Sequence, residues 1–353
     1  MHMADALISP AVGGGMWAAT AATLAYCAKK VTQAIDDRKV PLMGVLGAFI
    51  FAAQMINFTI PGTGSSGHLG GGMILTVLLG PFAAFLVTAS VLTVQALFFA
   101  DGGLLALGCN IFNLGFFPAF IAYPFIFKPL LGGNPTAGRL SLASIAAAIV
   151  GLQLGAFGVV LETGFSGISE LPFSTFVLIM QPIHLAIGVV EGLVTAAVLS
   201  FVWKARPEVM EIASGHQPIG QIPMKKVLLG LGIAAVFTGG VLSWFASAKP
   251  DGLEWSMLKV SGKEELAGRI GVHHTLGALQ KKTAFLPDYG FKKPEHEGAA
   301  AEGAAKEEAA PAWPAPDAGT TTSGIVGGLL TLLVAVAIGF ILKKRAKPHG
   351  ARV

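Results

Sequence analysis

The chain opens with residues suited to chelating a metal ion. His2 directly follows Met1 in the stretch MHMADALISP. The α-amine of Met1, the backbone amide nitrogen of His2 and the Nδ1 atom of its imidazole can bind one ion through two fused chelate rings. Because these three nitrogens lie in one plane, they leave one corner of a square for another ligand. Planar nitrogen coordination favours Ni(II) or Cu(II), and Co(II) is compatible with it.

A second histidine, His68, is the candidate for the fourth corner. It lies in NFTIPGTGSSGHLGGG, where the surrounding glycines let the backbone approach other elements closely. We expect Ser65 and Ser66 to orient its second ring nitrogen, as outer hydrogen-bond partners of metal ligands do. The alternative is that an opening Met-His pair arises by chance and that His68 is a solvated loop residue.

Four of the polar residues within apolar stretches are candidates for a functional or structural role. His184 and Glu191 are seven apart in one predicted span and therefore share a helix face. Ionisable residues inside a bilayer are functional candidates, so we expect a role in supporting or gating the site, or else a polar contact that fixes packing. Asn110 and Asn113 share a face of another predicted helix. They are expected either to hold the histidine loop or the N-terminal segment, or to join helices.

Other polar residues have simpler expected roles. Asp101 is expected to cap a helix, and His273 and His274 to be a solvated pair. Gly188 and Gly192 belong to a pattern of small residues that suits close packing of helices within the molecule.

These residues lie in a chain with the composition of a membrane protein. Of its 353 residues, 53% are hydrophobic and only 12% are charged, whereas a soluble domain carries about 25% charged residues. The net charge of +4 comes with short basic clusters, which indicate membrane topology and not a nucleic-acid surface. Cys27 and Cys109 lack a metal-binding spacing and are expected in the core.

The apolar segments predict an all-α, polytopic bundle of about seven helices followed by a two-helix hairpin with an outer loop. The segments run at about 11–28, 41–58, 73–100, 104–128, 140–162, 172–203, 225–247 and 323–342. We expect a break at Gly80–Pro81, because proline interrupts a helix. Lys29 and Lys30 follow the first segment, and the positive-inside rule then places the N-terminus outside and the C-terminus in the cytoplasm.

The sequence divides into three parts. Residues 1–206 are expected to form the metal-binding transmembrane part, and residues 207–223 a polar cytoplasmic linker. Residues 224–353 are expected to form the hairpin, whose outer loop carries the motif PDGLE. Within this loop, the stretch from Glu295 to Ala318 is rich in Ala, Glu and Pro and is expected to be a disordered tether.

Several separated stretches resemble one known family. MHMADALISP, NFTIPGTGSSGHLGGG, LLGPFAAFLVTASVLTVQALFFADGGLLALGCNIFNLG and HLAIGVVEGLVTA are similar to the substrate-binding subunits of cobalt/nickel energy-coupling factor transporters, the CbiM/NikM family. PDGLEWSMLKV, FLPDYGF and SGIVGGLLTLLVAVAIGFIL resemble the accessory CbiN/NikN subunit, here fused to the first.

The resemblance implies uptake of nickel, preferentially, or cobalt across a bacterial or archaeal cell membrane. It implies metal binding by the Met1 amine, by the amide and imidazole of His2, and by His68. The implied partners are a transmembrane coupling subunit and cytoplasmic ATPases, and the outer loop is expected to dock on the substrate-binding part and assist metal loading. The chain lacks the GxxxxGK[ST] motif that binds ATP phosphates and is expected not to be an enzyme.

Two alternative functions would use other residues of the chain. A secondary transporter driven by an ion gradient would use His184 and Glu191 as its relay. An intramembrane metalloenzyme would require HExxH or a second carboxylate cluster, and the sequence contains no HExxH.

Overall fold

The computed structural model describes residues 2–35, 39–169, 171–205, 224–263, 266, 271–292 and 313–346. Met1, the expected linker at 207–223 and residues 295–312 of the expected tether lie outside these ranges. Ala318, the last residue of that stretch, begins a helix.

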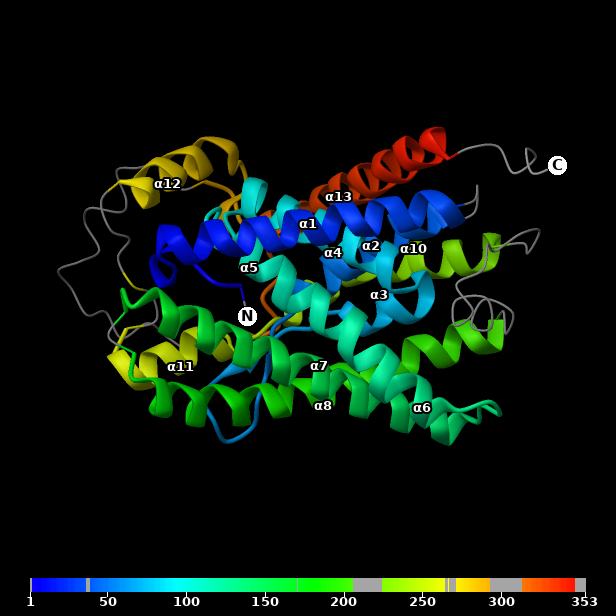
Figure 1. The fold of residues 1–353 in the computed structure, drawn as a ribbon, viewed down its shortest axis with the longest axis horizontal. Coiled ribbons are helices and arrows are strands. Elements are labelled where there is room, and N and C mark those ends of the chain that lie inside the picture. The colour runs from blue at the N-terminus through cyan, green and yellow to red at the C-terminus, as the bar shows by residue number, and fades with distance from the viewer. Residues whose placement is uncertain are drawn as a thin grey trace.

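The described chain is almost entirely helical, as expected (Figure 1). The helices of the first part are α1 (Pro10–Ala34), α2 (Lys39–Gln54), α3 (Gly72–Leu79), α4 (Pro81–Val94), α5 (Leu107–Ile111), α6 (Lys128–Leu131), α7 (Ala137–Ser166) and α8 (Phe173–Ala205). The helices of the second part are α10 (Lys225–Gly240), α11 (Gly252–Ser261), α12 (Val272–Thr283) and α13 (Ala318–Arg345). Short 3-10 turns η1 (Asp5–Leu7), η4 (Leu242–Phe245) and η5 (Pro287–Tyr289) and π-helical segments η2 (Gln95–Phe99) and η3 (Phe112–Phe127) complete the helical structure.

The break at Gly80–Pro81 is present. Gly80 has a φ of 78°, which a glycine adopts readily, and Pro81 opens α4 at a position where its missing N–H costs nothing. The apolar segment 73–100 is therefore a short helix followed by a long one.

Five of the described helical stretches have the length and hydropathy needed to cross a membrane: 81–99, 107–131, 137–166, 173–205 and 318–345. Such segments have few charged residues, and their backbone hydrogen bonds are satisfied within the helix. Helices α2 and α10 have 16 residues each and are shorter. The chain is a multi-pass membrane protein.

Small residues set how closely the helices approach. In α8, a Cβ on Gly188 would lie 3.0 Å from Cα of Ile149 in α7, so these two helices meet at their backbones. Gly192 makes the same kind of contact one turn further on, against Ile145. The prediction that these glycines pack inside the molecule is confirmed.

The second part packs on the first through its long helices and its outer segment. Helices α10 and α13 lie against α2, and Gly239 and Gly324 let α10 and α13 cross in backbone contact. Helices α11 and α12 lie at the end of the bundle where α1 begins, while α13 ends at the opposite end (Figure 1). We call the end with α11 and α12 the site end.

Candidate metal-binding site

The N-terminal segment is fixed inside the site end by backbone hydrogen bonds. The Met3 N–H donates to Asn110 Oδ1 (2.8 Å), and Asn110 Nδ2 donates to the Met3 carbonyl (3.2 Å). The Gly103 N–H also donates to that carbonyl (2.9 Å). Both Met3 and Asn110 are buried. Asn110 therefore holds the N-terminal segment, which is one of the two roles expected from the sequence.

Asp5 sets the register of the same segment. Its Oδ1 accepts hydrogen bonds from the amides of Leu105 (2.7 Å) and Ala106 (3.0 Å). A Cβ on Gly103 would collide with Asp5, so the backbones of these two segments are in direct contact. This contact places His2 beside Gly102, where the Cβ atom of His2 would lie 3.3 Å from an added Cβ.

The histidine loop is fixed from the opposite direction by α8 and α2. Glu191 accepts hydrogen bonds from the amides of Gly70 (2.8 Å) and Gly71 (3.1 Å), immediately before α3. Gln54 Nε2 donates to the Gly70 carbonyl (2.8 Å). Strands β1 (Phe58–Thr59) and β2 (Ser66–Gly67) pair antiparallel and close the loop. A buried carboxylate on two loop amides is a strong, directional contact, so Glu191 anchors the loop that carries His68.

The two histidines meet. The ring centroids of His2 and His68 are 4.9 Å apart and the rings are inclined by only 11°. With metal–nitrogen bonds of about 2 Å, two imidazoles on neighbouring corners of a square have centroids roughly 4–5 Å apart. Both side chains are less than a tenth exposed, at 7% and 8%. The two imidazoles therefore lie close together in a buried site.

The ring nitrogens differ in their partners. His68 Nδ1 lies 3.1 Å from the Leu69 carbonyl, which favours a proton on Nδ1 and a lone pair on Nε2. Burial, only partly offset by the charge of Asp101, lowers the pKa of His2 to about 4, so its imidazole is neutral at pH 7. Its Nδ1 lies 3.2 Å from Asp101 Oδ1. Its Nε2 is buried without a hydrogen-bond partner among the described residues.

Side chains alone do not form a metal site here. Within the described ranges, no group of three or more His, Cys, Asp and Glu side chains can hold a metal ion. The chelate predicted from the sequence draws its other donors from the backbone and the chain terminus. Met1, which carries the terminal amine, lies outside the described ranges.

The expectation for Ser65 and Ser66 differs from the structure, whereas Asn113 has one of its two expected roles. Ser65 and Ser66 do not hold the His68 ring. Ser66 Oγ donates to the Lys249 carbonyl (2.7 Å) and Ser65 Oγ to the Ser66 carbonyl (3.0 Å), so they shape the loop and join it to the second part. Asn113 donates to Glu162 (2.8 Å) and so joins two helices, which is the second of the two roles expected from the sequence. Sequence reasoning did not single out Glu162.

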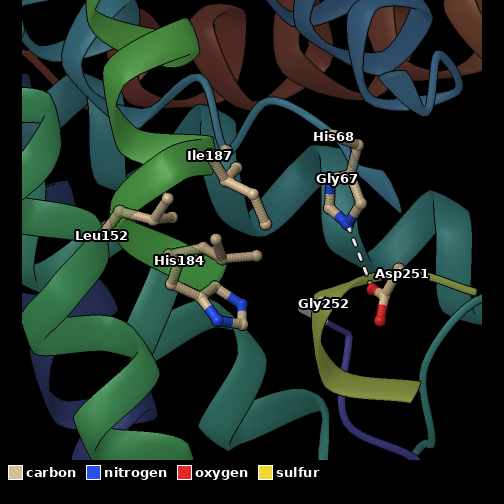
Figure 2. Close-up of a pocket in the computed structure, with 9 residues that line it drawn as sticks. Gly67, His68, Leu152, His184, Ile187, Asp251 and Gly252 are labelled. Atoms are coloured by element: carbon tan, nitrogen blue, oxygen red, sulfur yellow. Dashed lines mark ion pairs between the residues drawn. The ribbon is translucent and has the colours of Figure 1, made fainter. Parts of the chain in front are cut away.

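His184 and Glu191 share a face of α8 but bind different groups. His184 Nδ1 lies 2.8 Å from the Met180 carbonyl one turn earlier, while Glu191 binds the histidine loop. The Nε2 of His184 is buried without a hydrogen-bond partner among the described residues. It faces a cavity of about 10 Å³ whose lining includes His68 and Asp251 (Figure 2), which is room for roughly one water molecule.

Residues of the second part lie at the site, and the expectations for Asp101 and His273 are wrong. Asp251, in the PDGLE motif, has its Oδ2 at 3.7 Å from His68 Nε2, the ion pair drawn in Figure 2. Asp101 does not cap a helix, since its carboxylate lies between His2 and the hydroxyl of Tyr289. His273 is not solvated, because it is buried with Nε2 at 2.9 Å from the Ile8 carbonyl, whereas His274 is exposed. The PDGLE and PDY motifs can be seen in the sequence, but their position next to the two histidines cannot.

Comparison with known proteins identifies the chain. Residues 2–209 match the family model CbiM, described as the cobalt uptake substrate-specific transmembrane region. The chain belongs to this family. Residues 225–344 match the PDGLE domain. The resemblance drawn from the sequence is confirmed.

Relatives with assigned names lie in the same family. The chain is 37% identical over 210 residues to a putative metal transport protein of Haloquadratum walsbyi, covering 60% of this chain and 93% of that one. It is 35% identical over 211 residues to a putative fused nickel transport protein NikMN of Archaeoglobus fulgidus, covering 60% and 68%. It is 28% identical over 286 residues to the fused nickel transport protein NikMN of Rhodobacter capsulatus, covering 77% and 81%.

Solved structures agree with the fold of the first part. A crystal structure described as a truncated transition metal transporter matches with a TM-score of 0.52 and 30% identity, covering 58% of this chain and 99% of that one. The chain is thus a CbiM-type component of metal transport with a PDGLE domain fused to it.

Proposed function

We propose that this protein is the substrate-binding membrane component for uptake of a divalent transition metal, nickel preferentially and cobalt as well. The ion is bound by the Met1 amine, the His2 amide nitrogen and Nδ1, and His68 Nε2. The observation that carries the proposal is the proximity of the His2 and His68 rings, whose centroids are 4.9 Å apart in a buried site.

The surroundings support this ligand set. Because described side chains alone form no metal cluster, the backbone and terminal nitrogens are the donors that complete four-coordination. The hydrogen bonds of Asn110 and Glu191 hold the two histidine-bearing segments from opposite directions. Pre-organised ligands of this kind lose little freedom on binding.

Chelation through Nδ1 requires a movement of His2. Its Nδ1 faces Asp101, and its Nε2 has no hydrogen-bond partner among the described residues. A rotation of the ring by half a turn about the Cβ–Cγ bond exchanges the two edges of the imidazole. Nδ1 is then released to the metal, and Nε2 turns towards the Asp101 side, giving the carboxylate–imidazole–metal arrangement common in metal sites.

Nickel is preferred on two grounds. Planar four-nitrogen coordination suits Ni(II) better than the harder, octahedral ions. The fused relatives from Archaeoglobus fulgidus and Rhodobacter capsulatus, which carry both parts in one chain, are named nickel transport proteins.

Energy for transport comes from partners. We propose that a transmembrane coupling subunit and cytoplasmic ATPases act with this chain, as in energy-coupling factor transporters. The site end faces outside and the C-terminus faces the cytoplasm, in accord with the basic residues Lys343, Lys344 and Arg345 at the other end of α13. Residues 1–206 bind the metal, 207–223 link the parts and 224–353 form the accessory hairpin. Release inward requires the histidine loop to separate from the N-terminal segment, and we place Glu191 and His184 at that step.

The gradient-driven alternative is less well supported. It needs Glu191 and His184 to pass protons to each other, but each is engaged by a different partner.

The test is Ni(II) binding to the purified full chain by isothermal titration calorimetry. We expect loss of stoichiometric binding in His2→Ala, in His68→Ala and in a variant with one glycine added before Met1. His274→Ala, an exposed histidine, is the matched control and retains binding. Full binding by the extended variant would exclude the amine as a ligand. For the partners, uptake of Ni(II) into cells should depend on the ATPases and survive a protonophore, and the opposite pattern would favour the gradient-driven alternative.

A further inference from the structure

The outer segment of the second part, defined here as the described residues 249–263 and 271–292, contacts all three pieces of chain that build the site. The Ser66 N–H donates to the Pro250 carbonyl (2.8 Å) at the histidine loop. Gln280 Nε2 donates to the Gly102 carbonyl (2.7 Å), and His273 lies against the Ile8 carbonyl (2.9 Å). These contacts dock the outer segment without involving either candidate metal-binding imidazole.

Two side chains of the outer segment approach the imidazoles themselves, one directly and one through Asp101. The first is Asp251, whose carboxylate is held by its own helix. Its Oδ1 accepts hydrogen bonds from the amides of Leu253 (2.7 Å) and Glu254 (2.9 Å) at the start of α11. The other oxygen, Oδ2, is thereby directed at His68 Nε2, 3.7 Å away. Gly252 makes the approach possible, because an added Cβ would lie 3.0 Å from the ring of His184.

The second is Tyr289, in η5. Asp288 and Tyr289 both have left-handed backbone conformations, with φ of 50° and 59°, which non-glycine residues adopt at an energetic cost and most often at functional sites. This turn stacks the Tyr289 ring on Phe99, with centroids 5.2 Å apart. The hydroxyl then donates a hydrogen bond to Asp101 Oδ2, while Oδ1 of the same carboxylate lies 3.2 Å from His2 Nδ1.

We propose that Asp251 and Tyr289 support metal binding, Asp251 by placing its carboxylate beside the metal-binding Nε2 of His68 and Tyr289 by acting on the His2 imidazole through Asp101. This inference rests on the proposed function, because it takes both imidazoles as ligands. It goes further by assigning one residue of the fused PDGLE domain to each imidazole.

The contacts that Asp251 and Tyr289 make near the imidazoles are different from the contacts that dock the outer segment. The partner of the other ring nitrogen orients a metal-binding imidazole, and its loss costs roughly 10–100-fold in metal affinity. A carboxylate beside the metal-binding nitrogen, as Asp251 is, attracts the cation instead. The docking contacts through Ser66, Gln280 and His273 do not depend on the Asp251 charge or on the Tyr289 hydroxyl. Removing either group should therefore alter the metal site while the outer segment remains docked.

The experiment uses the purified full chain and NiCl₂ alone. Asp251→Asn keeps an oxygen to cap α11 but removes the charge facing His68. Tyr289→Phe removes only the hydroxyl and keeps the stacking on Phe99. The matched controls are Asp317→Asn, another aspartate that caps a helix, and Tyr26→Phe, an exposed tyrosine. For each variant, calorimetry gives the Ni(II) affinity, the visible absorption band of bound Ni(II) reports the ligand field, and the melting temperature without metal reports docking and folding.

We expect each single variant to bind Ni(II) roughly 10-fold more weakly, with a shifted absorption band and the melting temperature of its control. Because the two residues act on separate imidazoles, the double variant should lose roughly the product, about 100-fold. Wild-type affinity with an unshifted band would overturn the inference for that residue. A weaker affinity with a lower melting temperature and an unshifted band would also overturn it, because that pattern indicates a purely structural role. If His2→Ala and His68→Ala bind Ni(II) normally, the proposed function itself fails.

Discussion

Replacing Asn110 with alanine should weaken metal binding by loosening the N-terminal segment. In the native protein, the Asn110 side chain accepts from the Met3 N–H and donates to the Met3 carbonyl. Alanine removes both bonds, but the carbonyl keeps its second donor, the Gly103 N–H. One buried donor, the Met3 N–H, therefore loses its partner. Met3 is fully buried, so water does not replace that partner without local opening.

The size of the effect follows from that single unsatisfied group. Leaving one buried donor unpaired costs about 1–3 kcal/mol. If this cost opposes the position of the N-terminal segment that carries His2, the dissociation constant for Ni(II) rises between about 5-fold and 150-fold. A cost of about 1.4 kcal/mol corresponds to a factor of ten. Calorimetric titration of the full chain with NiCl₂ measures this ratio directly.

Asn113→Ala is the matched control. Asn113 is equally buried and lies three residues further along, but it donates to Glu162 and does not touch the N-terminal segment. We expect Asn113→Ala to lower the melting temperature and to leave the Ni(II) affinity of the folded protein close to that of the wild type. The reasoning is refuted if Asn110→Ala binds Ni(II) as tightly as the wild type, or if both variants lose affinity equally.

Three further changes have defined outcomes. Glu191→Ala removes the acceptor for the amides of Gly70 and Gly71. It should weaken Ni(II) binding in calorimetry at least 10-fold, because hydrogen bonds to a charged group contribute about 1.5–3 kcal/mol. Burial, followed by the charge of Asp251, raises the pKa of Glu254 to about 7, so its contribution to stability is present below its ordinary value of 4.5 and is lost as the pH rises through 7. Glu254→Gln should accordingly melt at a higher temperature than the wild type at pH 8 and at the same temperature below pH 4.5. Gly324→Ala should lower the melting temperature, because its Cβ would collide with the backbone of α10, whereas Gly232→Ala meets nothing and should raise it slightly.

Each of these three predictions would be contradicted by a specific result. Glu191→Gln keeps one acceptor oxygen and should fall between the wild type and Glu191→Ala, so equal binding by all three would exclude loop anchoring. A constant difference in melting temperature between Glu254→Gln and the wild type across this pH range would show that Glu254 does not titrate near 7. Equal melting temperatures for the two glycine variants would mean that the crossing of α10 and α13 adjusts without cost.

The sequence by itself determined the class of protein, the principal helices and the two histidines. Low charge and long apolar runs require a membrane environment, since no soluble fold can bury that much apolar surface. Gly80–Pro81 determined the division of 73–100 into two helices, because both residues act on the local backbone. The position of His2 after Met1 predicts the chelate that we propose, since such a chelate depends only on the order of neighbouring atoms along the chain.

Only the tertiary structure decided which side chains surround those histidines. Asn110 and Asn113 have the same type, helix and burial, yet one holds Met3 and the other binds Glu162, because the partner of a polar side chain depends on which helix lies opposite. Asp101 is separated from Tyr289 by 188 positions, and His68 lies nearly as far along the chain from Asp251 of the PDGLE motif. Sequence patterns report periodicity over a few turns, whereas these contacts depend on how α11 and η5 dock on the site end. The ligands that we propose could be predicted along the chain, but the groups that surround them required the fold.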